Sequence, residues 1–139
     1  MFFENDFVRI DTSNPPFVEI TVKPDLGLCT IEAFDEYSKH ITQVSNAPHL
    51  RLVDLDMMFA ANPTLLKPLA DWVSKQAPVL RENCIACAFV VSSIHSKQAI
   101  DKLFTYQKAP YPYAIFGSKT EAQRWALAQW QASDKVLNY

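Results

Sequence analysis

Two short segments near the start of the chain alternate apolar and polar residues. They are residues 7–11, Phe-Val-Arg-Ile-Asp, and residues 17–22, Phe-Val-Glu-Ile-Thr-Val. Strict alternation is typical of a strand that has one face in the core and the other in water. The intervening residues 12–16, Thr-Ser-Asn-Pro-Pro, are typical of a turn. The two segments are therefore predicted to form an antiparallel hairpin.

Two later segments carry apolar residues almost without interruption. Residues 50–55 read Leu-Arg-Leu-Val-Asp-Leu, and residues 85–91 read Ile-Ala-Cys-Ala-Phe-Val-Val. Such runs are typical of strands that are covered on both faces, as in a parallel sheet. Residues 113–116, Tyr-Ala-Ile-Phe, predict a short fifth strand.

Apolar residues recur at helical spacing in the remaining segments, and four helices are expected. Their approximate ranges are residues 30–45, 62–77, 96–107 and 118–132. Ser96 and Ser118 are expected N-caps, and Ser118 begins the capping-box pattern Ser-x-x-Glu. Pro78 is expected to end or kink the second helix, because a proline cannot donate a backbone hydrogen bond.

The order of these elements defines the expected fold class, β-β-α-β-α-β-α-β-α. Alternating strands and helices predict parallel strands joined by right-handed crossovers, and the initial hairpin adds an antiparallel strand. We therefore expect an α/β fold with a mixed, mostly parallel five-stranded sheet and about four helices. The pattern contains no repeat or linker, so residues 1–139 are expected to form a single domain.

Composition and charge narrow the possible functions. Hydrophobic residues are 49% and charged residues 20% of the chain, and the formal net charge is −2 with scattered lysines, so nucleic-acid binding is not expected. No apolar run is long enough to span a membrane, and the first residues lack the pattern of a signal peptide, which favours a cytoplasmic protein without membrane insertion. Only two glycines are present, which excludes the P-loop and the G-x-G-x-x-G motif.

The chain contains a Cys-x-x-Cys pattern at Cys84 and Cys87. A zinc site needs four ligands, and the sequence contains no second cysteine pair, so no metal and no cofactor is expected. Residues three apart on a regular strand point to opposite faces, which also disfavours a redox pair. We interpret both cysteines as buried structural residues.

Several segments, spread over most of the chain, resemble the SpoIIAA-like family of STAS domains and their STAS/SEC14-type relatives. The resemblance rests on residues 17–20, 52–55, 70–73, 88–93 and 110–116, and on Glu121, Ala122 and Trp125. Its most specific part is the ending Pro-Tyr-Pro-Tyr-Ala-Ile-Phe followed by Glu-Ala-x-x-Trp.

The resemblance implies a small bacterial module that binds a partner and has no catalytic activity. It also implies that some members bind nucleotides and that SEC14-type relatives bind lipids. In the anti-sigma-factor antagonists of this family, a phosphorylated serine follows the third strand. The corresponding segment, residues 56–63, contains no serine, so the phosphorylation switch is not expected in this chain.

The carboxyl ends of the parallel strands are the expected binding site, because ligands of open α/β sheets bind there. Helix N-termini at the same edge would favour an anion. Met57, Met58 and Phe59 either form an apolar docking surface or pack as a staple on the second helix. The candidate binding residues are Asp54, Asp56, Met57, Met58, Phe59, Ser93, His95 and Lys97.

A second hypothesis is Mg²⁺-dependent phosphotransfer at the pair Asp54 and Asp56, because Asp-x-Asp at a strand end resembles the haloacid-dehalogenase arrangement. The sequence lacks the acidic pair that this chemistry requires after a later strand. The favoured expectation is therefore a module without catalytic residues that binds an unknown protein partner or a small apolar or anionic ligand. A lipid-binding protein of the SEC14 type is an alternative, and the chain is expected to be a monomer or a homodimer.

Overall fold

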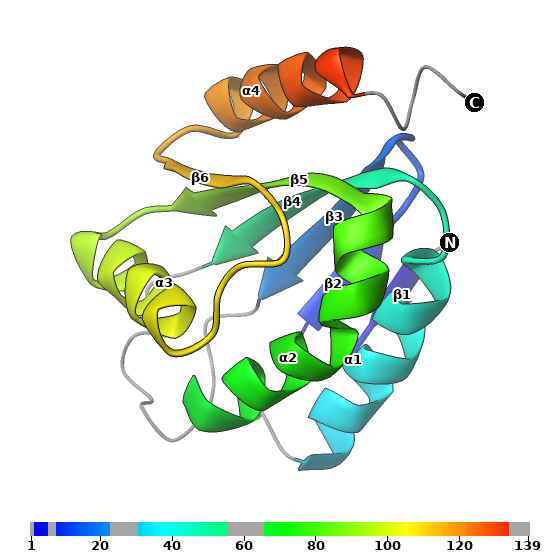
Figure 1. Ribbon diagram of the computed structural model, residues 1–139, viewed down its shortest axis with the longest axis vertical. Helices are drawn as coiled ribbons and strands as arrows, with labels where there is room; N and C mark the ends of the chain where they lie inside the picture. Colours follow the sequence, from blue (N-terminus) through cyan, green and yellow to red (C-terminus); the bar gives the residue numbers. More distant parts are fainter. Residues whose placement is uncertain (1, 6–7, 23–30, 56–65, 134–139) are drawn as a thin grey trace.

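A mixed six-stranded sheet forms the centre of the computed structural model, which describes residues 2–5, 8–22, 31–55 and 66–133 (Figure 1). The strands lie in the sheet in the order in which they occur along the chain. Their bounds are β1 Phe2–Glu4, β2 Val8–Asp11, β3 Phe17–Val22, β4 His49–Leu55, β5 Cys84–Val91 and β6 Tyr113–Phe116.

The direction of pairing changes once across the sheet. The pairs β1–β2 and β2–β3 are antiparallel, whereas β3–β4, β4–β5 and β5–β6 are parallel. The predicted hairpin is β2 and β3, in which Ile10 lies opposite Ile20. The two apolar runs form the adjacent central strands β4 and β5, where both faces are covered.

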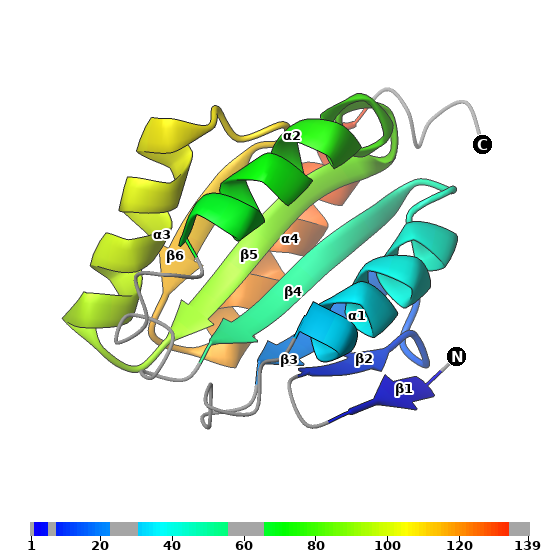
Figure 2. The same ribbon diagram turned by 90° about the horizontal axis from the view of Figure 1, so that it is seen from below.

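Four helices cover the sheet unequally. Helices α1, α2 and α3 lie on one face, and α4 lies alone on the other (Figure 2). This follows from the strand order, because three right-handed crossovers that each advance one strand in the same direction place their helices on the same face. The bounds are α1 Ile31–Val44, α2 Leu66–Asn83, α3 Ile94–Tyr106 and α4 Lys119–Ala132.

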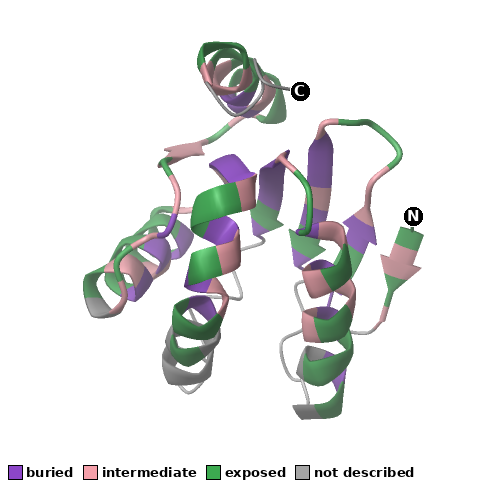
Figure 3. Cartoon of the chain, turned by 45° about the vertical axis from the view of Figure 1, so that its right-hand side comes forward, coloured by how far each residue is buried: buried purple, intermediate pink, exposed green. Residues whose placement is uncertain are grey.

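The sheet therefore separates two apolar layers, and the buried positions concentrate on the strands and on the inner sides of the helices (Figure 3). The larger layer packs α1 and α3 against β2–β5 through residues such as Ile20, Ile41 and Phe89. In the smaller layer, Ala122 and Ala126 of α4 are fully buried in one cluster with the small residues Ala86 and Ala88 of β5. Small side chains on both sides are what allow this helix to approach the sheet closely.

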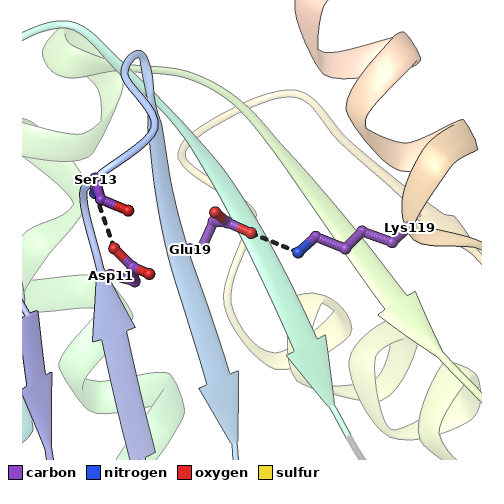
Figure 4. A network of polar contacts seen from close by, with 4 residues as sticks. All are labelled: Asp11, Ser13, Glu19 and Lys119. Atoms are coloured by element: carbon purple, nitrogen blue, oxygen red, sulfur yellow. Dashed lines mark hydrogen bonds and ion pairs between the residues drawn. The ribbon is translucent and has the colours of Figure 1, made fainter.

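Apart from Phe17, the part of the α4 face formed by β2 and β3 is polar, as their alternating sequences predict. At its boundary, Lys119 Nζ at the start of α4 lies 2.8 Å from Glu19 Oε1 on β3 (Figure 4). In the turn after β2, the Ser13 backbone N–H donates to Asp11 Oδ1 at 2.8 Å (Figure 4). A single helix is thus enough for this face, because its buried apolar side chains are confined to β4–β6 and to Phe17 at the start of β3.

The predicted α/β class, the mostly parallel sheet and the four helices are confirmed. The strand count of five was wrong, because β1 adds a three-residue antiparallel edge strand that is too short to show a pattern. Pro78 was predicted either to end or to kink α2. It does not end the helix, which continues to Asn83. The carbonyl that loses its helical donor is that of Ser74, which is exposed, so water can satisfy it.

The prediction of Ser96 as an N-cap was also wrong. Helix α3 begins two residues earlier than expected, and its N-cap is Ser93. The predicted cap at Ser118 is confirmed, and its side chain accepts from the Glu121 backbone N–H. None of the helices in the described residues is both long and apolar enough to span a membrane.

The close packing of α4 predicts that Ala126→Leu destabilises the fold by about 1–3 kcal/mol, because a larger side chain cannot fit between α4 and β5 without displacing them. The matched control is Ala128→Leu, since Ala128 is exposed on the same helix; there the change should stay within about 0.5 kcal/mol. Urea unfolding of the two variants measures the difference, and equal midpoints would contradict this packing.

Candidate functional site

The carboxyl ends of β4 and β5 meet at one edge of the sheet, as the predicted binding site requires. Asp54 pairs in register with Val90, one residue before the end of each strand, and Ser93 follows β5 by two residues. Asp54 is exposed. The other predicted residues after β4, namely Asp56, Met57, Met58 and Phe59, lie outside the described residues.

Ser93 is engaged in local hydrogen bonds. Its Oγ accepts from the Ser96 backbone N–H at 3.2 Å and donates to Ser96 Oγ at 3.3 Å. Ser96 is fully buried, so the two hydroxyls secure the first turn of α3 against the core. Ser93 is therefore accounted for by capping, which stabilises a helix by about 1 kcal/mol.

The first turn of α3 presents an apolar side chain to solvent. Ile94 is 66% exposed, the largest exposed fraction of the three large hydrophobic residues that are exposed in the described part of the chain. His95 and Lys97 of the predicted site are exposed beside it. The sequence analysis missed Ile94, because its periodicity suggested a helix that starts only at residue 96.

The described residues of the predicted site lie on opposite faces of the sheet. Asp54 shares its strand face with Leu50 and Leu52, which pack in the α4 layer, whereas α3 covers the opposite face. Strands β3–β6 also progress in one direction, so this part of the sheet has no reversal of strand order, the feature that opens a ligand crevice in doubly wound folds. Within the described ranges, no group of three His, Cys, Asp or Glu side chains is arranged to hold a metal ion.

A different polar cluster lies buried at the opposite end of the parallel strands. Arg51, the third residue of β4, is only 4% exposed. Its Nη2 donates to Ser45 Oγ at 2.8 Å, and its Nε donates to His49 Nε2 at 3.4 Å. Ser45 follows the end of α1, and the Asn83 side chain at the end of α2 donates to the Ser45 carbonyl at 3.0 Å. The guanidinium therefore connects the end of α1 to the start of β4, and Asn83 attaches the end of α2 to the same serine.

Burial of this cation is compensated by neutral acceptors and helix dipoles. Among the described residues, the titratable groups close enough to act on Arg51 are the thiols of Cys84 and Cys87 and the phenols of Tyr37 and Tyr111. None of them is a carboxylate. The carboxyl end of α1, where carbonyl dipoles favour a cation, lies beside Arg51. Every buried side-chain nitrogen and oxygen in the described residues has a hydrogen-bond partner, as a stable buried network requires.

The hydrogen bonds of His49 define its tautomer. Its Nδ1 lies 2.8 Å from the Ala47 carbonyl and must donate, so its Nε2 is the acceptor for Arg51. Burial and the nearby Arg51 charge lower the pKa of His49 from 6.5 to about 4, although its bond to Ala47 opposes this. His49 is therefore neutral at pH 7, and the network depends on that neutrality.

Cys84 and Cys87 lie on the same face of β5, so the prediction of opposite faces was wrong. His49 pairs with Cys84 and Arg51 with Cys87, because Ile85 is the extra residue of a β-bulge. The prediction that both cysteines are buried is confirmed. Burial raises the pKa of Cys87 well above its ordinary value despite the Arg51 charge, so its thiol is neutral and unreactive at pH 7.

The sequence contained a signal for this network that pattern analysis did not use. Arg51 interrupts an otherwise apolar strand, and a buried arginine needs acceptors that the sequence does not place. The structure supplies them from β4 itself and from the ends of neighbouring elements. The network is buried and hydrogen-bonded, and it connects the ends of α1 and α2 to the start of β4. No known protein family, curated protein or solved structure matches the chain.

The lowered pKa of His49 predicts a specific loss of stability in acid. Because the unfolded state binds a proton near pH 6.5 and the folded state only near pH 4, stability is complete above 6.5 and falls as the pH decreases through this window. The full difference is about 3 kcal/mol.

The control for this prediction is His49→Gln, whose amide oxygen can accept from Arg51 and does not titrate. Chemical unfolding of both proteins from pH 7 to pH 4 should show a steeper loss for the histidine protein. Parallel curves for the two proteins would contradict the proposed role of the neutral imidazole.

Proposed function

We propose that this chain is a SpoIIAA/STAS-like binding module without catalytic activity that docks a partner protein at the carboxyl end of β5. The observation that supports this most is Ile94, an isoleucine 66% exposed in the first turn of a helix. We call Ile94, His95 and Lys97, together with the cap Ser93, the α3 docking surface. Asp54 lies at the same edge on the other face of the sheet.

The arrangement of polar groups favours binding over chemistry. Ser93, the only hydroxyl of the docking surface, is engaged in capping, and no base–nucleophile pair is formed there among the described residues. The polar residues that do converge, around Arg51, are buried beneath α1 at the other end of the strands. A surface that combines an exposed aliphatic side chain with a charged rim resembles a small protein-recognition patch.

Three apolar residues that follow β4 in the sequence are included in this proposal because of their chemistry. Met57, Met58 and Phe59 follow directly from the strand that neighbours β5, and methionines suit adaptable docking surfaces. They are included in the proposal because their apolar chemistry matches that of Ile94. A small apolar or anionic ligand at this edge is a different outcome, which the same experiments would detect.

The proposal predicts that Ile94→Asp abolishes partner binding and leaves the fold intact. An exposed position should tolerate the change within about 0.5 kcal/mol, whereas a charge in an apolar contact typically prevents binding. Affinity capture with the tagged full chain, followed by protein identification, compares this variant with the unmodified chain.

The matched control is Leu127→Asp, which places the same charge at an exposed leucine of α4 on the other face of the molecule. The partner should bind this variant as it binds the unmodified chain. Equal capture by Ile94→Asp would contradict the proposed surface. Native mass spectrometry of the purified chain would reveal a co-purified small molecule as added mass, and such a ligand lost in Ile94→Asp would replace the protein partner in this proposal.

A further inference from the structure

The two outer helices of the three-helix face carry opposite charge. Helix α3 and the residues after it expose Lys97, Lys102 and Lys108 and a single carboxylate, Asp101. Helix α1, at the far side of the same face, exposes three carboxylates and one lysine (Figure 2). These residues are Glu32, Asp35, Glu36 and Lys39. The face is therefore polarised, although the chain as a whole has a net charge of only −2.

The lysines of α3 are not neutralised within the molecule. In the described part of the chain, no carboxylate forms an ion pair with Lys97, Lys102 or Lys108, whereas Lys119 of α4 is paired with Glu19 at 2.8 Å (Figure 4). The one acidic residue of α3, Asp101, accepts a hydrogen bond from the Tyr113 hydroxyl. The charge of α3 is thus available to a group from outside.

The helical spacing arranges these charges around the exposed isoleucine. At about 100° per residue, one exposed line of α3 contains Ile94, Gln98, Asp101 and Thr105. Lys97 lies on one flank of this line and Lys102 on the other. The inward residues Ile100 and Leu103 are buried on the opposite side. An apolar position at one end of the line is therefore followed by about two turns of helix with a lysine on each flank and one carboxylate, Asp101, which is engaged by Tyr113.

We propose that this strip of α3 binds an acidic segment of a partner protein, with an apolar side chain of that segment placed against Ile94. The inference rests on the proposed function and names the chemistry of the partner. Complementary charge at the edge of a small apolar contact accelerates association and selects the partner. A partner segment confined to α3 also avoids the carboxylates of α1.

Two other occupants fit the charges less well. A nucleic acid or an anionic membrane is too extended to meet α3 and avoid α1, whose carboxylates would repel it. The α1 helix of a second copy has the right charge, but a contact between α1 of one copy and α3 of the next is heterologous and would propagate instead of forming a closed dimer.

The test is photo-crosslinking of the full chain from position 94, with a benzophenone side chain in place of Ile94. The control carries the same group at position 127, on α4. Crosslinked peptides from a cell extract are identified by mass spectrometry. The expected adduct at position 94 is a segment rich in Asp and Glu, absent at position 127, and its yield should fall as salt is raised from low to high concentration.

Charge reversal separates this inference from the proposed function. Lys97→Glu with Lys102→Glu should lower the yield at position 94 about tenfold or more, because like charges would then face each other. Lys39→Glu with Lys75→Glu makes the same change in net charge on α1 and α2 and should leave the yield unchanged.

Each other outcome overturns a defined statement. An adduct at position 94 that is insensitive to Lys97→Glu with Lys102→Glu, or that maps to a neutral or basic segment, overturns the acidic partner and leaves the docking surface intact. An adduct with nucleic acid, lipid or a second copy also overturns the acidic partner. Absence of an adduct at position 94, or equal adducts at both positions, overturns the proposed function itself.

Discussion

A buried guanidinium that has no carboxylate neighbour in the described part of the chain constrains how the elements around it meet. Arg51 is 4% exposed, and a buried cation is tolerated only where hydrogen-bond acceptors and favourable dipoles surround it. Ser45 and His49 supply the acceptors, and both lie in the connection from α1 to β4 or at its end. The end of α1 and the start of β4 must therefore come together, because removing either would leave the guanidinium without an acceptor. The end of α2 joins them through the hydrogen bond from Asn83 to the Ser45 carbonyl.

This constraint gives the two ends of the parallel strands different roles. The amino-terminal end is closed by hydrogen bonds and by the bulge that places Cys84 and Cys87 beside Arg51. The carboxyl-terminal end carries Ile94, an exposed apolar side chain, and the lysines of α3, which form no ion pair with any described residue. A hydrogen-bonded base with an apolar and cationic surface at the other end supports the binding role that we propose for α3.

The order and type of the long elements could be predicted because apolar periodicity records burial directly. Residues 50–55 and 85–91 are apolar on both strand faces because helices cover both faces, and α4 was predicted through its capping box at Ser118. Strand β1 could not be predicted, since three residues carry no period and the strand depends on its pairing with β2. The shared face of the cysteines depends on a bulge relative to β4, a register that no single strand encodes. The exposure of Ile94 depends on the cap at Ser93 instead of Ser96.

The measurement that tests the central role of Arg51 most directly is a double-mutant cycle of Arg51→Met and Ser45→Ala at pH 7. Each free energy of unfolding is measured for the unmodified chain, the two single variants and the double variant. If the guanidinium connects the end of α1 to β4, the two effects are not additive, and the coupling is about 1–3 kcal/mol. Effects that add within about 0.5 kcal/mol would contradict that role and would show that α1 and β4 are held together by apolar packing alone.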